Sequence, residues 1–538
     1  MDRRRFLASG AALLAAGCGG SAPRTPPGQM VSLQHALGHR LRAQDFPPPG
    51  ETRRRKVVIV GAGIGGLSAA WRLRRAGFDE FEMLELEPVP GGNARWGANA
   101  VSEYPWGAHY LPLPTPASRA VRLLLSELGV LKGDPAAEAP RYDERALCFT
   151  PLDRHYRLGT WREGLAPLHG ADARSREQWP RFLERMEAFR KLRGRDGRRA
   201  FEIPLALSSR DPSLLALDRI SMHAWLRAEG FESEAVSWYV DYACRDDYGC
   251  SARDASAWAG IHYFAGRNAR AANADADTVL TWPEGNGWLV KRLLERVQPP
   301  LTFNALVYRI EESPRDIVVH AYLAAERRTV QIRAEHLVWA APLRFAARAL
   351  NAAASPLAAA LGEFDHSPWM VANLTLEAPP APQHGAPLAW DNVLYDSPSL
   401  GYVVATHQQV SAAGGPTVLT YYLPLSGEAP AAARRRLLDT PRERWAEAVM
   451  ADLARPHPEI RELTRSLDVL ASGHAMVRPR PGLIWSEARR RALEGTRRLH
   501  AAHSDASGLS IFEEAQYHGV RAAERVLARS GAREATLL

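Results

Sequence analysis

The chain has 538 residues, of which 46% are hydrophobic and 24% are charged, as is ordinary for a soluble globular protein with more than one core. Its formal net charge is +8, but only four of its 68 basic residues are lysine, and no basic motif interleaved with aromatic residues accompanies them. This arginine excess, together with the heavy use of Ala, Pro and Gly, is typical of codon bias, and we expect no nucleic-acid partner.

The first twenty residues form a targeting segment in front of the fold. Asp2-Arg3-Arg4-Arg5-Phe6-Leu7 matches a twin-arginine export signal, and the apolar run behind it is too short to span a bilayer. Leu14-Ala15-Ala16-Gly17-Cys18 resembles a lipobox, which would make Cys18 a lipidated N-terminus. An ordinary Sec signal, and cleavage to a soluble periplasmic protein, are the alternatives. We therefore expect export to the periplasm, with membrane anchoring if Cys18 is lipidated.

Residues 21–52 are rich in Pro, Gly and Arg and show little periodicity. Such a composition is typical of a flexible linker. The sequence therefore predicts a tether between the targeting segment and a folded part that begins near residue 53.

The strongest motif follows the tether directly. Four consecutive β-branched residues predict a buried strand, and from Leu67 onwards the chain continues at helical period. Between them, Gly61, Gly63 and Gly66 fill the pattern G-x-G-x-x-G. The first glycine makes the tight turn, the second lets a pyrophosphate approach the backbone, and the third lets the helix pack on the strand. The cofactor-binding residues predicted in this turn are Gly61, Ala62, Gly63, Gly65 and Gly66.

A carboxylate ends the next predicted strand. Glu85 lies 19 residues after Gly66, where it can accept both hydroxyls of an adenosine ribose. The helix that follows the glycines presents free N–H groups and the positive end of its dipole to phosphates. Strand, turn, helix and acid together predict that the chain binds a dinucleotide.

Gly91 and Gly92 begin six residues after Glu85. The order V-I-V-G-A-G-I-G-G-L, then M-L-E, then Gly-Gly resembles the flavin-containing amine oxidase superfamily, which includes monoamine and polyamine oxidases, protoporphyrinogen oxidase and carotene desaturases. The resemblance implies an α/β fold, with a Rossmann-like FAD-binding domain that carries a β-meander and an inserted α+β substrate domain. It also implies FAD as the cofactor. Asn93 stands where the family has Arg or Lys, and Arg95 follows two residues later.

Two later segments resemble the same family. Val307 matches the residue whose backbone pairs with adenine, within a run of short strands that looks like the family's β-meander. Asp505 matches the acidic residue beside the ribityl-phosphate, although Ser504 stands where the family has Gly. A helix beginning near Glu513, beside the cofactor-binding candidate Phe512, should aim its N-terminus at the flavin. The strands expected in the meander are 301–310, 316–323, 328–333 and 337–340.

The resemblance also divides the chain into two domains, whose expected ranges are 53–114, 281–364 and 481–530 for the FAD-binding domain, and 115–280 and 365–480 for the substrate domain. Apolar residues from Trp179 to Leu192 recur at helical spacing, which predicts a helix packed on the core or, alternatively, one apposed to a membrane. Strands over 369–376, 400–406 and 417–424 should form the floor of the substrate cavity. The aromatic residues around them form either a cage for a cation or a plain core.

No catalytic residue can be named from the sequence, because the flavin itself accepts the hydride. Amine oxidases of the family place a Lys on the strand that corresponds to 369–376, and this strand contains none. His109 is either a proton acceptor near the flavin or a structural histidine. The cluster Arg245-Asp246-Asp247-Tyr248 either receives a substrate ion or forms a solvated helix end.

Three cysteines remain behind the targeting segment, and none has the spacing of a zinc site, so we expect no metal. Cys244 and Cys250 could form a disulfide in an oxidising periplasm, which leaves Cys148 over, or the cysteines are buried thiols. The C-terminal part contains no Cys that could attach a flavin covalently.

The sequence as a whole predicts an exported FAD-dependent oxidoreductase that takes a hydride from an amine or an apolar organic substrate. A polyene or tetrapyrrole desaturase with an acceptor other than oxygen, and a non-catalytic flavin-bound protein at a membrane, are the alternatives. A reductase driven by NAD(P)H is disfavoured, because no second G-x-G-x-x-G accompanies the first. The substrate, the electron acceptor and the oligomeric state stay open.

Overall fold

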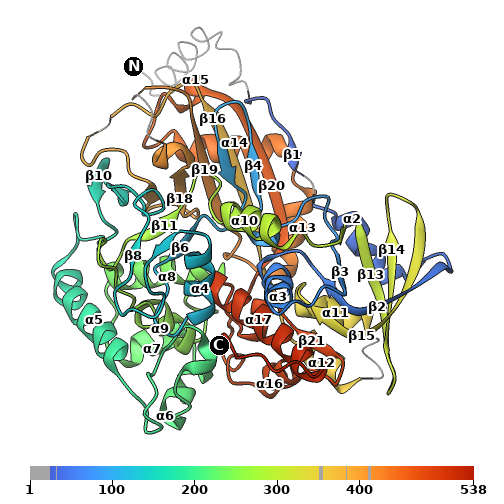
Figure 1. Cartoon of the computed structure of the whole chain (residues 1–538). Coiled ribbons are helices and arrows are strands. Elements are labelled where there is room, and N and C mark those ends of the chain that lie inside the picture. Colours follow the sequence, from blue (N-terminus) through green and yellow to red (C-terminus); the bar gives the residue numbers. More distant parts are fainter. Residues whose placement is uncertain (1–24, 32, 351–354, 383, 410–413) are drawn as a thin grey trace, which may run out of the picture.

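The structure is a computed structural model that describes residues 25–538 except 32, 351–354, 383 and 410–413. Two large sheets organise it, one beside the glycine turn and one above it in the view of Figure 1. A group of helices lies below the upper sheet, at the lower left of the same view. The expected export signal, including Cys18, lies outside the described residues.

A seven-stranded sheet carries the glycine motif, and its order is β12-β3-β2-β15-β14-β13 with β21 beside β15. Its parallel strands are β12 (Leu301–Thr302), β3 (Phe81–Leu84), β2 (Pro49–Val60), β15 (Arg328–Trp339) and β21 (Leu499–Ala501). Val57, Val58 and Ile59 are fully buried, because alternate residues enter the cores on opposite faces of the sheet. One face packs on α3 (Ile64–Arg75), α10 (Gly287–Val297) and α17 (Phe512–Arg529). The other packs on α11 (Leu343–Ala349), α12 (Pro356–Gly362) and α16 (Glu487–Glu494).

The expected β-meander is present as β13 (Ala305–Glu312), β14 (Ile317–Leu323) and the first half of β15, all antiparallel neighbours. The prediction of separate strands over 328–333 and 337–340 is wrong, because β15 is continuous from Arg328 to Trp339. Its first half pairs with β14 and its second half with β21, while β2 runs beside nearly its whole length. The polar residues between 333 and 337, which suggested a turn, therefore lie inside the continuous strand β15.

The eight-stranded sheet has the order β1-β20-β16-β19-β18-β17-β9-β10. Its strands are β1 (Met30–Val31), β20 (Thr464–Val477), β16 (His366–Leu376), β19 (Thr417–Pro424), β18 (Gly401–Val404), β17 (Asp391–Leu394), β9 (Asp153–Arg157) and β10 (Thr160–Glu163). Along β16, Met370 and Leu374 point to the core under α13 (Pro430–Asp439) and α14 (Arg442–Leu453), whereas Trp369 and Val371 point to the opposite face. That opposite face is shared with Trp106 and Tyr104 of the glycine-turn region.

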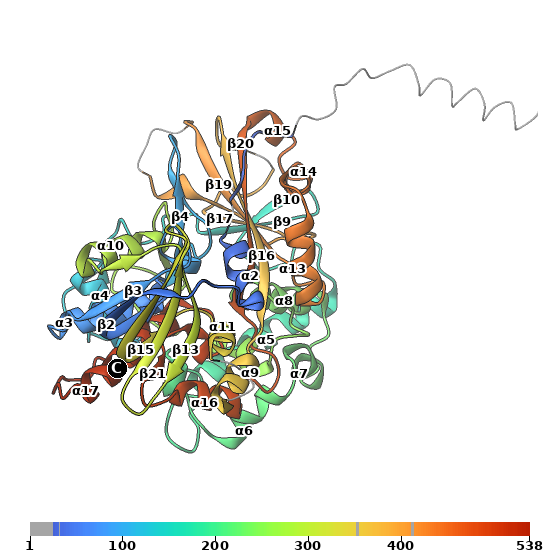
Figure 2. The same ribbon diagram turned by 90° about the vertical axis from the view of Figure 1, so that its right-hand side faces the viewer.

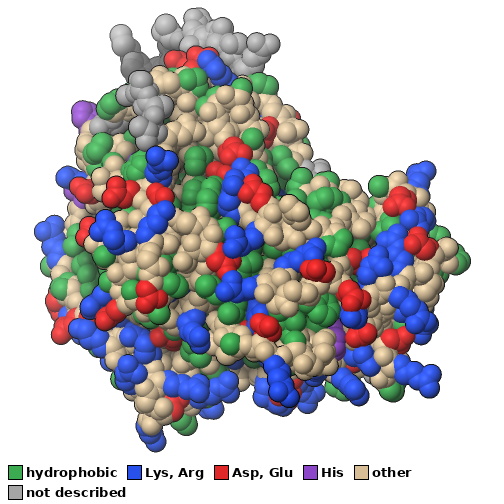
Figure 3. Space-filling model, viewed as in Figure 1, with side chains coloured by type: hydrophobic (Ala, Val, Ile, Leu, Met, Phe, Trp, Pro, Cys, Tyr) green, Lys and Arg blue, Asp and Glu red, His purple; other side chains and the backbone are tan. Residues whose placement is uncertain are grey.

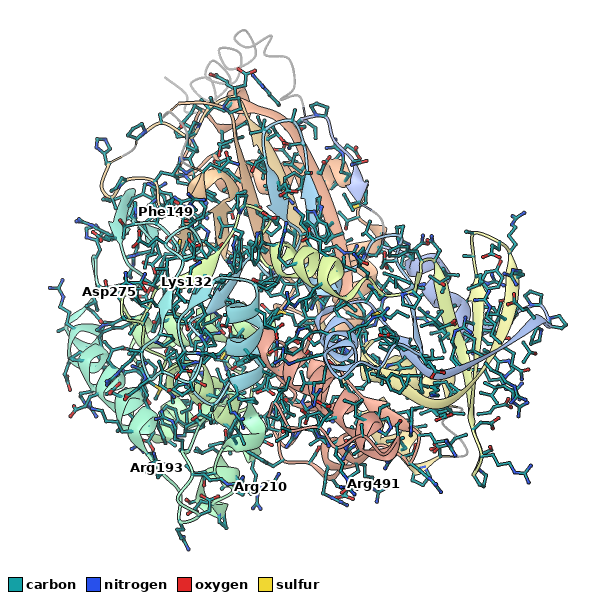
Figure 4. The ribbon with its side chains drawn as sticks, in the orientation of Figure 1. Lys132, Phe149, Arg193, Arg210, Asp275 and Arg491 are labelled. Atoms are coloured by element: carbon teal, nitrogen blue, oxygen red, sulfur yellow. The ribbon has the colours of Figure 1, made fainter. Side chains whose placement is uncertain are left out.

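The helical part contains α5 (Ala173–Lys191), α7 (Met222–Ala228), α8 (Glu234–Tyr248) and α9 (Ala257–Ala265). Trp179, Phe182, Met186 and Phe189 of α5 are buried against α8 and α9, so the predicted amphipathic helix packs on the core. Leu183 and Leu192 remain exposed. Arg193 and Arg210, farther along the chain, point outward at the lower edge of this part (Figure 4).

The prediction of a flexible tether over 21–52 is wrong for its described residues. Met30 and Val31 form β1 on the edge of β20, where the N–H of Leu467 also donates to Pro27 O at 2.8 Å. The helix α2 (His35–Ala43) then buries Leu37 and Leu41 beside the meander. A composition rich in Pro and Gly does not exclude an edge strand, which tolerates both residues. The free edge of β20 supplies the backbone hydrogen bonds that order this segment.

The expected domain boundary at residue 115 also differs from the structure. The helix α4 (Arg119–Glu127) buries Val121, Leu124 and Leu125 in the same core as α3 and α17. Residues just after 115 therefore pack with the glycine-turn domain, because the apolar stripe of α4 faces that core. The three cysteines, Cys148, Cys244 and Cys250, are buried and unbridged.

The surface mixes charges of both signs. On the face shown in Figure 3, Lys and Arg are interspersed with Asp and Glu and do not gather in one basic patch. Within the part of the chain that the structure describes, no helix is both long enough and apolar enough to cross a bilayer. Figure 2 shows the meander strands standing edge-on beside the helices of the C-terminal segment.

Candidate functional site

The glycine turn contains two kinds of glycine. A side-chain carbon on Gly65 or Gly66 would clash with the carbonyl oxygens of Ala502 and Gly61, respectively, and Gly61 has φ +101°. These three glycines are required by the protein's own packing. Gly63 is different, because a Cβ there would meet no atom closer than 3.9 Å. The missing side chain at Gly63 therefore leaves space next to the N-terminus of α3, where a pyrophosphate can approach the backbone.

Glu85 lies against the same turn. Its Oε2 accepts the N–H of Ala62 at 2.6 Å, and its Oε1 accepts the N–H of Glu87 at 2.9 Å. The side chain is buried, and burial raises the pKa of Glu85, while the two backbone N–H groups act in the opposite direction. Each carboxylate oxygen keeps a further lone pair, so Glu85 can still accept the two hydroxyls of a ribose.

The Gly-Gly pair closes the turn from the other side. Gly91 and Gly92 have φ of +114° and +56°, and Gly91 forms a β-bridge with Gly63. The side-chain amide of Asn93 donates to Ala475 O in β20, and Arg95 lies 3.6 Å from the carboxylate of Glu87. Position 93 therefore joins the two domains by a neutral hydrogen bond and supplies no cation.

Val307 lies near Glu85 in the meander. The N–H of Ala305, two residues earlier in β13, donates to Glu85 O at 2.9 Å. The register of β13 and β14 shifts between Val307 and Arg309, and such a bulge leaves backbone groups outside the ladder. The place is suitable for a backbone contact to an adenine.

Asp505 is completely buried in a 3₁₀ turn, Ser504–Ala506. Its Oδ2 accepts the N–H of Leu343 at 2.8 Å and lies 3.0 Å from His366 Nε2. Its Oδ1 lies 3.0 Å from Nδ1 of His503, the atom that also accepts the N–H of Asp505, and forms no hydrogen bond with any other described residue. A buried carboxylate oxygen with a free lone pair can accept a hydroxyl of a ribityl chain.

The last candidate, Phe512, begins α17 and packs in the same apolar core as Ile64. The helix α17 contacts α3 so closely that a side chain on Gly519 would clash with the carbonyl of Gly65. Glu513, in the first turn of α17, is buried, and burial raises its pKa to about 7. The space at Gly63, the free lone pairs of Glu85 and the Oδ1 atom of Asp505 together fit an extended dinucleotide.

A second group of polar residues lies between the two sheets. His109 stacks on Tyr422 with ring centroids 4.7 Å apart, and Trp390 lies 5.4 Å from His109. Burial lowers the pKa of His109 to about 4, so the ring is neutral at physiological pH. We call this group, together with the carboxylates beside it, the acidic–aromatic cluster: His109, Tyr110, Tyr242, Asp246, Trp390, Asp391 and Tyr422.

The carboxylates of the cluster are desolvated. Tyr110 donates to Asp246 at 3.3 Å and Tyr242 donates to Asp391 at 3.5 Å. Burial, and next the charge of Asp247, raise the pKa of Asp246 to about 7. Burial, and then Asp246 and Asp153, raise the pKa of Asp391 well above its usual value. Because these groups are expensive to ionise alone, the cluster favours a cation beside them.

The nearby guanidinium groups are already engaged, since that of Arg245 lies 3.0 Å from Asp241. Arg267 binds both oxygens of Asp247 at 2.8 and 2.9 Å. Among the residues with described positions, no basic side chain forms an ion pair with Asp246 or Asp391. The prediction of a solvated helix end at 245–248 is wrong, because Arg245, Asp247 and Tyr248 are buried where α8 ends between the sheets.

The strand β16, expected from the sequence to correspond to a Lys-bearing strand of amine oxidases, contains no Lys and places Trp369 on the face toward Tyr422. Trp369 is buried, and its ring lies 6.5 Å from that of Tyr422. Lys291, which follows the loop 285–287, forms ion pairs with two carboxylates. It contacts Glu103 and lies 2.9 Å from Glu284. Asp391 was not predicted from the sequence. An acidic residue at the start of a strand is a weak signal when the elements packed against that strand cannot be read from the sequence.

Comparison with known proteins supports the fold. Residues 59–128 match the NAD(P)-binding Rossmann-like domain. Over 40 residues, 7% of this chain and 8% of the relative, the sequence is 58% identical to hydroxyneurosporene desaturase from Cereibacter sphaeroides. The match thus spans a small fraction of that protein's length and assigns no activity to this chain.

Solved structures match over most of the chain. The cyclohexylamine oxidase of Brevibacterium oxydans superposes with a TM-score of 0.64 at 16% identity, over 89% of this chain and 99% of that one. A putrescine oxidase variant superposes with a TM-score of 0.63 at 17% identity, over 89% and 100%. The chain therefore has a mixed α/β fold, with a Rossmann-like domain and a large second sheet, of the kind seen in flavin amine oxidases.

Proposed function

We propose that this chain is an FAD-dependent oxidoreductase that takes a hydride from an organic substrate. The observation that carries this proposal is the set of groups left free for an extended cofactor: the space at Gly63, the lone pairs of Glu85 and the Oδ1 atom of Asp505. Bound FAD would supply the hydride acceptance. The protein would hold it at these residues and keep water away from the reacting atoms.

The test is purification followed by a visible spectrum, and then anaerobic bleaching with a panel of compounds. We expect a flavin spectrum and, because the C-terminal part has no Cys, release of a yellow supernatant on acid denaturation. A colourless protein that does not take up added FAD would contradict the cofactor. Flavin that stays with the precipitate would contradict non-covalent binding.

For the substrate, we infer an amine. Among the described residues, Asp246 and Asp391 have no ion-pair partner, and the aromatic rings of His109, Trp390 and Tyr422 pack together in the same cluster. An ammonium group would stabilise the ionised carboxylates and interact with the rings. His109 is kept neutral by burial, and in this proposal it accepts a proton from the substrate.

A second candidate substrate is an apolar polyene or tetrapyrrole, oxidised with an acceptor other than oxygen. The absence of a Lys from the strand over 369–376 favours it, as does the short match to a desaturase. The compound panel separates the two. Bleaching by amines with release of peroxide supports the amine, whereas bleaching by polyenes alone supports the desaturase. A flavin that no compound reduces would favour a non-catalytic binding protein.

We also propose that the protein is exported by the twin-arginine route and anchored through Cys18. FAD is made inside the cell, and this route carries proteins already folded around their cofactor. The described part of the chain begins to pair with β20 at Pro27, so the stretch from Cys18 to Thr25 can reach at most about 25 Å. An anchor at Cys18 would therefore hold the edge with β1 and β20 close to the bilayer.

Two variants test this location. Replacing Arg3 and Arg4 by Lys should leave the protein in the cytoplasm with flavin bound, and unchanged export would contradict the twin-arginine route. Replacing Cys18 by Ala should move the exported protein from the membrane to the soluble periplasmic fraction. Membrane association that survives this change would point to the exposed leucines of the α5 region, Leu183 and Leu192, instead.

A further inference from the structure

A separate cavity lies away from the acidic–aromatic cluster, where three parts of the fold meet. Its volume is about 250 Å³. The loop between α8 and α9, the residue before β16 and the segment after β20 supply its lining, which consists of Arg253, Asp254, Asp365, Arg478, Arg480 and Pro481. None of these residues belongs to the dinucleotide candidates or to the acidic–aromatic cluster.

Guanidinium groups outnumber carboxylates around this cavity. Asp365 alone faces three of them, at 2.8 Å from Arg344, 3.5 Å from Arg434 and 3.9 Å from Arg478. Arg478 also lies 3.1 Å from Asp254, and Arg480 lies 3.6 Å from Glu363. Arg253, the fifth arginine, is exposed and forms no ion pair with any described residue. Five arginines thus share three carboxylates, which leaves a surplus of two positive charges.

The donors of these arginines are also incompletely used. Arg478 is mostly buried, with 14% of its side chain exposed. It forms ion pairs with Asp254 and, at a longer distance, with Asp365. Burial lowers the pKa of Arg434, and the neighbouring Arg344 and Arg478 lower it further despite Asp365. Burial, His366, Arg434 and Arg344 lower the pKa of His474 nearby to about 3. The surroundings of the cavity are therefore electropositive and partly shielded from water.

We propose that this cavity binds a small oxyanion, carried by a carboxylate or a phosphate group, between Arg253, Arg478 and Arg480. Guanidinium forks match the geometry of both groups, and Arg478, which is largely desolvated, binds them more strongly than a surface lysine would. The volume lies below the range of about 300 to 1,000 Å³ usual for drug-sized ligands, so the occupant is a small anion rather than a second dinucleotide. This proposal does not depend on the proposed redox function.

The test measures binding to the purified holoprotein by calorimetry, with inorganic phosphate and succinate as separate probes and sodium chloride at matched ionic strength as the blank. We expect saturable one-site binding of at least one probe, and the stronger of the two identifies the preferred group. Binding no stronger than the chloride blank would overturn the proposal.

Substitutions locate the site. The double variant Arg253→Gln/Arg480→Gln changes two exposed or half-exposed side chains and should weaken the bound probe by at least roughly tenfold, the loss expected for charge-assisted hydrogen bonds. Arg491→Gln is the matched control, because this exposed arginine lies on α16 and pairs with Glu487 (Figure 4). Equal weakening in both variants would reduce the effect to net charge and overturn the site.

A change of opposite sign guards against misfolding. Asp254→Asn removes a competing carboxylate from the lining and frees Arg478, so it should tighten binding severalfold. A damaged fold cannot produce such a gain. If Asp254→Asn weakens binding while the thermal midpoint of the protein is unchanged, the oxyanion does not lie against Arg478 and the proposal fails.

Discussion

The dinucleotide turn and the acidic–aromatic cluster are built in opposite ways. The turn comes from one stretch of chain, from β2 to Gly92, in which each residue's role follows from its neighbours. The cluster joins His109 and the start of β6 (Tyr110–Pro112) to α8, β17 and β19. A local motif thus identifies the cofactor class, whereas the substrate site depends on how distant elements meet.

The largest expected effect separates two glycines inside the turn. Gly65→Ala should destabilise the apoprotein by about 3 kcal/mol, because its new methyl group meets the carbonyl of Ala502 in a packed core. Gly63→Ala should destabilise the apoprotein by only about 1 kcal/mol, the cost of alanine at the N-cap of α3, but should remove dinucleotide binding, since its Cβ projects into open space. Urea unfolding and flavin titration measure the two effects. Equal destabilisation by both variants would show that Gly63 is a packing glycine.

The next effect concerns the cluster. Asp391→Asn should lower kcat/KM for an amine by about 100-fold, or 2–3 kcal/mol, because a neutral amide cannot balance an ammonium group. Asp153→Asn is a useful control, since Asp153 raises the pKa of Asp391 but hydrogen-bonds to none of the cluster. If Asp391→Asn leaves amine kinetics unchanged and polyene oxidation intact, the acidic–aromatic cluster serves an apolar substrate.

A smaller effect is expected at the ribose. Glu85→Ala should weaken FAD binding by about 1–3 kcal/mol, the value of charge-assisted hydrogen bonds to the hydroxyls. Glu85→Gln keeps the shape of the side chain and should retain part of the affinity. An unchanged dissociation constant in the alanine variant would remove Glu85 from the ribose site.

The smallest effect is a dependence on pH. Asp246 has a folded-state pKa raised to about 7, so the folded protein binds its proton more tightly than the unfolded chain does. Its contribution to stability is therefore fully present near pH 4 and is lost as the pH rises through about 7. Asp246→Asn should flatten this part of the stability profile, measured by urea midpoints from pH 4 to 8.

The same titration acts on substrate with the opposite sign. An ammonium binds the ionised form of Asp246, so KM for an amine should fall severalfold between pH 6 and pH 8. An apolar substrate should show no such change. A KM that rises over this range would contradict an ionised Asp246 as the partner of the substrate.

Much of the fold could be predicted from local patterns. The alternation over 417–424 coincides with β19, and the apolar period from Trp179 onwards coincides with α5, because burial of one face dictates each pattern. Errors arose where pairing decided the structure. β15 is continuous because β2, β14 and β21 hold it, and residues 27–31 are ordered because β20 had a free edge.

By itself the sequence determined the glycine turn, the acid at Glu85 and the dinucleotide class, because these depend on residues within about 30 positions of one another. Only the tertiary structure decided that Asp246 and Asp391 are desolvated with no ion-pair partner among the described residues, that Trp369 faces Tyr422, and that three arginines line a cavity at Asp365. Desolvation and charge balance are properties of a group's neighbours in space, and sequence spacing does not encode them.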